Sequence, residues 1–180
     1  MPVNSPEKSL FGTLEKQSLA KPVISLEKQA LADFRSGATI FDDYAGEPAN
    51  IRYKDYLIPV RDYSEIPIRI YNDDPKLKTP VLVMYPACGY ILDLFESNAI
   101  ACSRIAEFSQ IKVILVNFRL APENPLPISI YDAYDATKYI ARHAEKFGID
   151  RHKLYIGGLS SGAHTAAVVS NLARSDETRG

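Results

Sequence analysis

The stretch YIGGLSSGAH, residues 155–164, decides how the rest of the sequence is interpreted. It contains the pattern G-x-S-x-G, with Ser160 at its centre. A short strand-like segment, 153–156, precedes the pattern, and a helix-like segment, 161–172, follows it. A serine on a sharp turn between a strand and a helix projects its hydroxyl from the end of a sheet, as a nucleophile requires. The pattern therefore predicts a nucleophile at Ser160.

Two other uses of a glycine-rich turn compete with this interpretation. A phosphate-binding loop needs G-x-G-x-x-G or a G-K-[S/T] ending, and this stretch has neither. A plain turn needs only that Ser160 caps the following helix, because serine is a favoured N-cap residue. The residues of this stretch disfavour the phosphate loop and leave the helix cap open as the alternative to a nucleophile.

From about residue 51 onward, predicted strands and helices alternate. Such alternation is typical of an α/β fold with a mostly parallel sheet and flanking helices. The predicted strands are 51–60, 66–71, 81–85, 113–116 and 153–156, and the predicted helices are 97–109, 133–147 and 161–172. We expect the first two strands to form an antiparallel pair. The continuous apolar runs of the third and fourth strands predict burial on both faces.

Two helices give more detailed predictions. Helical spacing predicts which side chains of the first share a face, and a glycine marks the end of the second. In the helix 97–109 the apolar side is predicted to comprise Ile100, Ala101, Ile105 and Phe108. In the helix 133–147, Gly148 stands where a C-terminal cap belongs.

The first fifty residues follow a different pattern. The heptapeptide LEKQSLA, residues 14–20, returns as LEKQALA, residues 26–32. Two copies are too few for a repeat architecture, so we predict two helical segments interrupted at Pro22. The sequence is thus divided into an N-terminal helical segment, 1–50, and a core domain, 51–180.

The composition narrows the class of protein. The 180 residues carry a formal net charge of −1, which gives no electrostatic reason to expect a nucleic acid or an anionic membrane as partner. No apolar run has the length of a membrane span, and the N-terminus lacks the apolar core of a signal peptide. Two cysteines, Cys88 and Cys102, make neither a disulfide framework nor a zinc site. We expect a soluble, cytoplasmic protein.

Three motifs in order resemble the hormone-sensitive-lipase-like branch of the α/β-hydrolases, a family of carboxylesterases and lipases. Residues 81–90, VLVMYPACGY, look like the family's strand ending in H-G-G-G-aromatic, and residues 117–127, NFRLAPENPLP, resemble its D-Y-R-L-A-P-E-x-P-x-P loop. Residues 158–163, GLSSGA, resemble its G-D-S-A-G-G elbow. The resemblance spans 81–174 and implies an α/β-hydrolase core. By its position, segment 1–50 would be the helical cap over the active site.

The resemblance also implies a reaction and its residues. Ser160 corresponds to the nucleophile, and the backbone amides of Cys88, Gly89 and Ser161 correspond to the oxyanion hole. The implied function is hydrolysis of small carboxylic esters through an acyl-enzyme on Ser160, with no metal ion and no organic cofactor. Arg119 in the second motif is expected to be structural, as is Glu123.

The first motif departs from the family pattern, since Pro86-Ala87-Cys88-Gly89 replaces H-G-G-G. Proline removes one N–H, and the added side chains restrict the backbone where glycine would be free. Leu159 and Ala163 are milder departures in the elbow. The oxyanion hole is therefore expected to be degraded relative to the family.

The general base is the open question. In α/β-hydrolases the nucleophile is followed by an acid and then by a histidine on later segments. Only twenty residues follow Ser160, and His164 is the one histidine among them, while His143 and His152 precede the elbow. We expect these 180 residues to hold the N-terminal part of the fold, truncated after the elbow, with a sheet edge left open to self-association or a complementing chain. A serine esterase and a catalytically silent hydrolase-like protein both remain open.

Overall fold

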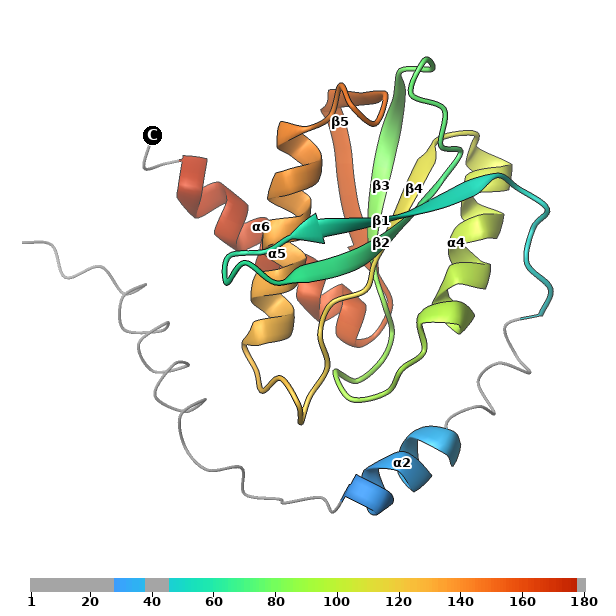
Figure 1. Ribbon diagram of the computed structural model, residues 1–180. Helices are drawn as coiled ribbons and strands as arrows, with labels where there is room; N and C mark the ends of the chain where they lie inside the picture. Colours follow the sequence, from blue (N-terminus) through green and yellow to red (C-terminus); the bar gives the residue numbers. More distant parts are fainter. Residues whose placement is uncertain (1–27, 38–45, 178–180) are drawn as a thin grey trace, which may run out of the picture.

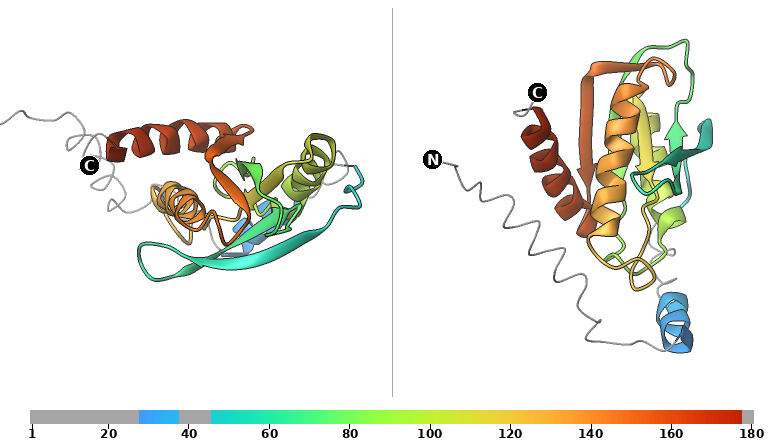
Figure 2. Two further views of the ribbon diagram at one scale, coloured as in Figure 1. Left: turned by 90° about the horizontal axis from the view of Figure 1, so that it is seen from above. Right: turned by 60° about the vertical axis from the view of Figure 1, so that its left-hand side comes forward.

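The computed structural model describes residues 28–37 and 46–177, which form a five-stranded sheet with helices on both faces (Figure 1; Figure 2). The strands are β1 (Tyr53–Pro59), β2 (Glu65–Tyr71), β3 (Thr79–Tyr85), β4 (Lys112–Val116) and β5 (Ile149–Gly158). The helices are α2 (Lys28–Gly37), α4 (Phe95–Ser109), α5 (Ile128–Arg142) and α6 (Ser161–Glu177). The predicted helical segment 14–20 and the break at Pro22 lie outside the described residues.

The sheet is mixed, in the order β1-β2-β4-β3-β5. The predicted antiparallel pair is confirmed as β1 and β2, and β2 also pairs antiparallel with β4. The other two pairings, β3 with β4 and β3 with β5, are parallel. The carboxyl ends of parallel strands meet at one edge of a sheet, which is where α/β folds place their ligands. Here that edge carries the loops 86–94 and 117–127 and the turn at 159–160.

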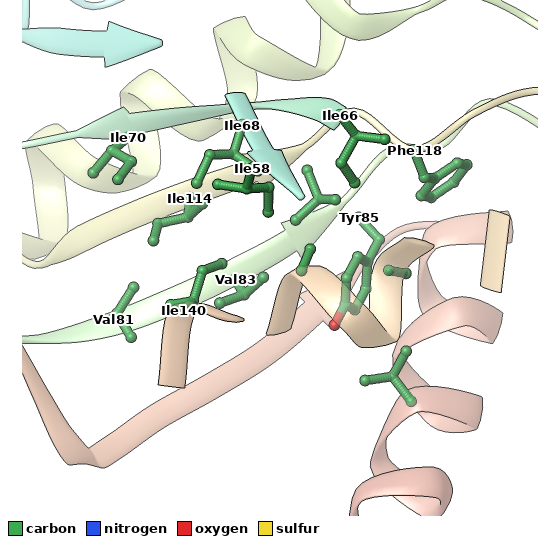
Figure 3. Packing of buried hydrophobic residues seen from close by; sticks show 14 of the residues in the cluster. Ile58, Ile66, Ile68, Ile70, Val81, Val83, Tyr85, Ile114, Phe118 and Ile140 are labelled. Carbon is green, nitrogen blue, oxygen red and sulfur yellow. The ribbon is translucent and has the colours of Figure 1, made fainter. Parts of the chain in front are cut away.

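The larger hydrophobic core lies between the sheet and α5 (Figure 3). Alternate residues of β2, namely Ile66, Ile68 and Ile70, have no exposed surface, because period-two alternation turns them all to this face. Ile140 of α5 is equally buried against them. Val169 of α6 joins the same cluster, so α5 and α6 cover one face of the sheet.

The opposite face is covered by α4, and here the predicted helix face was wrong. The buried residues of α4 are Ala99, Cys102, Ser103 and Ala106, whereas Phe108 is 85% exposed. Small side chains let the helix lie close to β4, and this close packing takes precedence over the hydrophobicity of the larger residues. β4 is fully buried on both faces, as predicted, but Leu82 and Met84 of β3 are only partly buried.

Two predicted element boundaries also changed. α5 ends at Arg142 with His143 as its C-cap, so Gly148 does not cap the helix. Gly148 instead lies in the turn before β5 with φ +62°, where an added Cβ would come within 2.8 Å of the Pro75 carbonyl oxygen. β5 is longer than predicted, because Gly157 and Gly158 still pair with β3.

Candidate active site

Ser160 lies on the sharp turn that joins β5 to α6, at the carboxyl edge of the parallel strands. Its φ is +53°, in the left-handed region that residues other than glycine rarely adopt. A strained backbone of this kind costs about 1–3 kcal/mol and persists only where the surrounding structure enforces it. The side chain is exposed, so the hydroxyl is accessible at the end of the sheet.

The two glycines of the pattern enforce this turn. A Cβ on Gly158 would come within 2.4 Å of the Gly162 carbonyl carbon, and a Cβ on Gly162 within 2.1 Å of the Tyr85 carbonyl oxygen. These are steric overlaps with backbone, which cannot be relieved by rotating a side chain. The start of α6 therefore lies directly against the ends of β5 and β3, and only glycine fits at both positions.

The loop after β3 brings two backbone amides to this turn. The N–H groups of Cys88 and Gly89 both donate to the side-chain oxygen of Ser161, at 3.0 and 2.9 Å. Gly89 has φ +54°, so the loop does use a glycine where its backbone is left-handed. All three residues predicted as oxyanion donors are thus brought together. The acceptor that the two loop amides contact is the Ser161 side chain, which the sequence does not predict.

Cys88 is buried, with 2% of its surface exposed, and its sulfur lies 3.9 Å from the Ser161 hydroxyl oxygen. Burial raises the pKa of the Cys88 thiol above its ordinary value. A thiol that keeps its proton at neutral pH is a poor nucleophile. Cys88 is therefore an unreactive, buried thiol, and the exposed Ser160 is the accessible nucleophile at this turn.

A tyrosine and a histidine lie beside the elbow. The Tyr90 hydroxyl is 2.6 Å from His164 Nδ1 and 3.1 Å from the Ser161 carbonyl oxygen. Tyr90 was not among the predicted site residues, although its place after the Pro-Ala-Cys-Gly segment matches the aromatic residue of the motif. His164 is exposed. One of its two ring nitrogens, Nδ1, is hydrogen-bonded to the Tyr90 hydroxyl.

The other two histidines are far from the elbow along the fold. His143 Nδ1 lies 2.8 Å from the Tyr139 carbonyl oxygen, and its ring stacks on Tyr139. His152 is in the amino-terminal half of β5, whereas Ser160 follows the carboxyl end of that strand. In the described part of the chain, the Ser160 hydroxyl has no hydrogen-bond partner. No described histidine is seen bonded to it.

The second motif positions the loop beside the site. Arg119 donates two hydrogen bonds from its guanidinium and one from its backbone N–H to Asp132, which has no exposed surface, and its guanidinium donates a further one to Asp62. The hydrogen bonds to these carboxylates raise the pKa of Arg119 despite partial burial. Removing one partner from such a pair leaves a buried charge uncompensated, which costs several kcal/mol. Arg119 therefore ties the loop after β4 to α5, in agreement with the structural role expected of it.

Glu123 of the same motif fastens α2 over this edge. Arg35 of α2 donates to both oxygens of Glu123, at 2.8 and 2.9 Å, and to the carbonyl oxygens of Ile91 and Ala121. The bond from Arg35 lowers the pKa of Glu123. One arginine thus joins α2 to both loops that border the elbow, and Figure 1 shows α2 at the end of the sheet where these loops lie.

Two features are absent from residues 28–37 and 46–177. No helix there is long and apolar enough to cross a membrane. No cluster of three histidine, cysteine or acidic residues there could hold a metal ion.

Comparison with known proteins gives the context of this geometry. The family model for the alpha/beta hydrolase fold matches residues 82–180, which is 99 of the 180 residues. An ethyl acetate hydrolase from Pseudomonas putida is 31% identical over 154 residues, covering 83% of this chain and 48% of the relative. An arylesterase from Saccharolobus solfataricus is 34% identical over 127 residues, covering 70% and 41%. The chain thus spans about half the length of these relatives.

Two solved structures of ester hydrolases are also similar to this chain. A hyperthermophilic esterase from Pyrobaculum calidifontis aligns with a TM-score of 0.73 and 32% identity, covering 98% of this chain and 56% of that one. An ester hydrolase from the metagenome of Lake Arreo aligns with a TM-score of 0.76 and 29% identity, covering 96% and 56%.

Proposed function

The chain belongs to the alpha/beta hydrolase fold family, as its motifs predict, and on that premise we propose that it carries the nucleophile of a carboxylic-ester hydrolase. The observation that supports this most is the backbone of Ser160. A non-glycine residue at φ +53°, enforced by two glycines that tolerate no Cβ, is a strained serine at the exposed end of a parallel sheet. A helix cap needs no such strain, because an N-cap residue has an ordinary extended backbone.

In the proposed reaction, the Ser160 hydroxyl oxygen attacks the carbonyl carbon of an ester and gives up its proton to a base. The carbonyl oxygen becomes negatively charged in the tetrahedral intermediate and accepts hydrogen bonds from the backbone N–H groups of Cys88, Gly89 and Ser161. The intermediate collapses to an acyl-enzyme and releases the alcohol. Water then attacks the acyl carbon and releases the acid. No metal ion or organic cofactor takes part.

The base is not assigned to a described residue. His164 is the imidazole nearest the elbow in sequence, but among the described residues no hydrogen bond joins its ring to the Ser160 hydroxyl. The curated relatives have about twice the length of this chain. We propose that solvent hydroxide takes the Ser160 proton when these residues act alone, and that the acid and the histidine of the faster reaction come from polypeptide outside them.

The substrate is proposed to be a small carboxylic ester whose acyl part lies between the elbow and the N-terminal segment, 1–50. The attachment of α2 to the loops at this edge supports a cap in that position. We retain the division into this cap and a core domain, 51–180, as part of the proposal, together with a cytoplasmic location.

A catalytically silent protein is the second candidate. It is favoured by the Ser161 side chain, which already occupies the two loop amides that an oxyanion would need. Losing one such donor typically lowers turnover by about 10²–10³-fold.

The test is hydrolysis of 4-nitrophenyl butyrate by the protein, by Ser160→Ala and by Ser170→Ala. Ser170 is an exposed serine on α6 and serves as the matched control. We expect hydrolysis above the uncatalysed rate, lost in Ser160→Ala and kept in Ser170→Ala. Equal rates in all three would favour the silent protein.

A further inference from the structure

The hydroxyl of Ser161 lies at the point on which the loop amides of Cys88 and Gly89 converge. The Ser161 hydroxyl oxygen accepts a hydrogen bond from each of these N–H groups, at N···O distances of 3.0 and 2.9 Å. It donates its own hydrogen bond to the Pro86 carbonyl oxygen, at 3.3 Å. A hydroxyl has two acceptor sites and one donor, so this one is fully used. The G-D-S-A-G-G motif that the elbow resembles has alanine at the position of Ser161, and alanine has no side-chain oxygen.

Two backbone amides that point at one position beside a nucleophile bind a developing negative charge on oxygen. They cannot also bond a second oxygen while the Ser161 hydroxyl occupies that position. A bound carbonyl oxygen or carboxylate therefore competes with the Ser161 side chain for the same two donors.

The hydroxyl can leave without moving the backbone. Rotation about the Cα–Cβ bond of Ser161 changes only the place of its oxygen, and serine has three staggered rotamers available. Gly89 is exposed, and a Cβ built on it would meet no atom within 4 Å, so the loop is open to solvent on that side.

We propose that Ser161 is a positioning residue whose hydroxyl closes the oxyanion-binding position and must rotate away before a carboxylate or a tetrahedral intermediate can bind. The proposal rests on the proposed function for the identity of the anion. It goes beyond that function because the oxyanion-binding position is occupied by the Ser161 hydroxyl when no ligand is bound. Ser161 then determines how tightly the position binds an anion.

The test uses a background in which the nucleophile is absent, so that the two proposals are separated. Ser160→Ala and the double variant Ser160→Ala/Ser161→Ala are titrated with sodium butyrate, and the backbone amide signals of Cys88 and Gly89 are followed by ¹⁵N–¹H NMR. Butyrate is a product-like carboxylate that needs no covalent step. Ser160→Ala/Ser170→Ala is the matched control.

We expect the double variant to bind butyrate about tenfold more tightly than Ser160→Ala, because the anion no longer displaces a hydroxyl that accepts two hydrogen bonds. The shifts should centre on the Cys88 and Gly89 amides. The control should bind as Ser160→Ala does. Because every protein in the titration lacks the nucleophile, a failure of ester hydrolysis would not alter the result.

Equal affinities, or weaker binding after the loss of Ser161, would overturn the proposal and leave the hydroxyl as a support for the loop. A Ser161→Ala chain that loses the dispersed NMR spectrum of the folded protein would overturn it as well, since an occupant needed for folding is not displaceable.

Discussion

At the scale of the residue, the elbow depends on what is absent from two positions. Gly158 and Gly162 lie where any Cβ would overlap neighbouring backbone, and this is why Ser160 can be held in the left-handed region. The G-x-S-x-G pattern, together with the strand-like and helix-like segments on either side of it, is enough to predict this turn. It does not predict the position of the Ser161 hydroxyl, because that depends on how the loop 86–90 folds back onto α6.

The residue-scale prediction concerns Gly162. Gly162→Ala should lower the free energy of unfolding by about 1–3 kcal/mol or more, because the new methyl group would overlap the Tyr85 carbonyl oxygen. Gly37→Ala is the matched control, since no atom lies within 4 Å of a Cβ there, and it should change the value by less than about 1 kcal/mol. Urea denaturation measures both. Equal effects would mean that α6 does not lie as close to β3 as described.

At the scale of the element, sequence patterns predicted buried faces correctly where hydrophobic periodicity alone determined them. The apolar run of β4 and the alternation in β2 were interpreted correctly, because burial on a sheet follows directly from period and hydrophobicity. The face of α4 was misassigned, because there close packing of small residues competed with hydrophobicity. The extent of β5 was underestimated, since its glycines looked like a turn and instead continue the pairing with β3.

β5 lies at one edge of the sheet, at the end of the strand order. In the described part of the chain β5 pairs only with β3, and Tyr155 is 57% exposed. An open strand edge is a template for pairing with another chain, so we propose that two copies associate through β5. Light scattering should show a mass that rises with protein concentration. Tyr155→Lys should reduce this association, because charged residues on an edge strand oppose pairing.

Tyr63→Lys is the control for that experiment, since Tyr63 is 96% exposed at the turn between β1 and β2, away from the β5 edge. It should associate as the unchanged protein does. A monomer at every concentration would contradict association through β5.

At the scale of the whole molecule, three segments distant in sequence converge on one edge of the sheet. The loop after β3 supplies two amides, the loop after β4 is fixed to α5 by Arg119, and α2 is fastened to both loops by Arg35. The sequence motifs predicted the first two of these segments. The role of Arg35 could not be predicted, because its partners lie 56 to 88 residues away and nothing local to α2 indicates them.

A nucleophilic Ser160 is tested by mass spectrometry of the protein after brief exposure to 4-nitrophenyl butyrate and acid quenching. We expect a butyryl group on the peptide that contains Ser160, retained in Ser170→Ala and absent from Ser160→Ala. The covalent adduct reports the attack itself, whatever the rate of the later hydrolysis. Finding no butyryl group on Ser160, or the same labelling of that peptide in Ser160→Ala, would show that Ser160 is not the nucleophile.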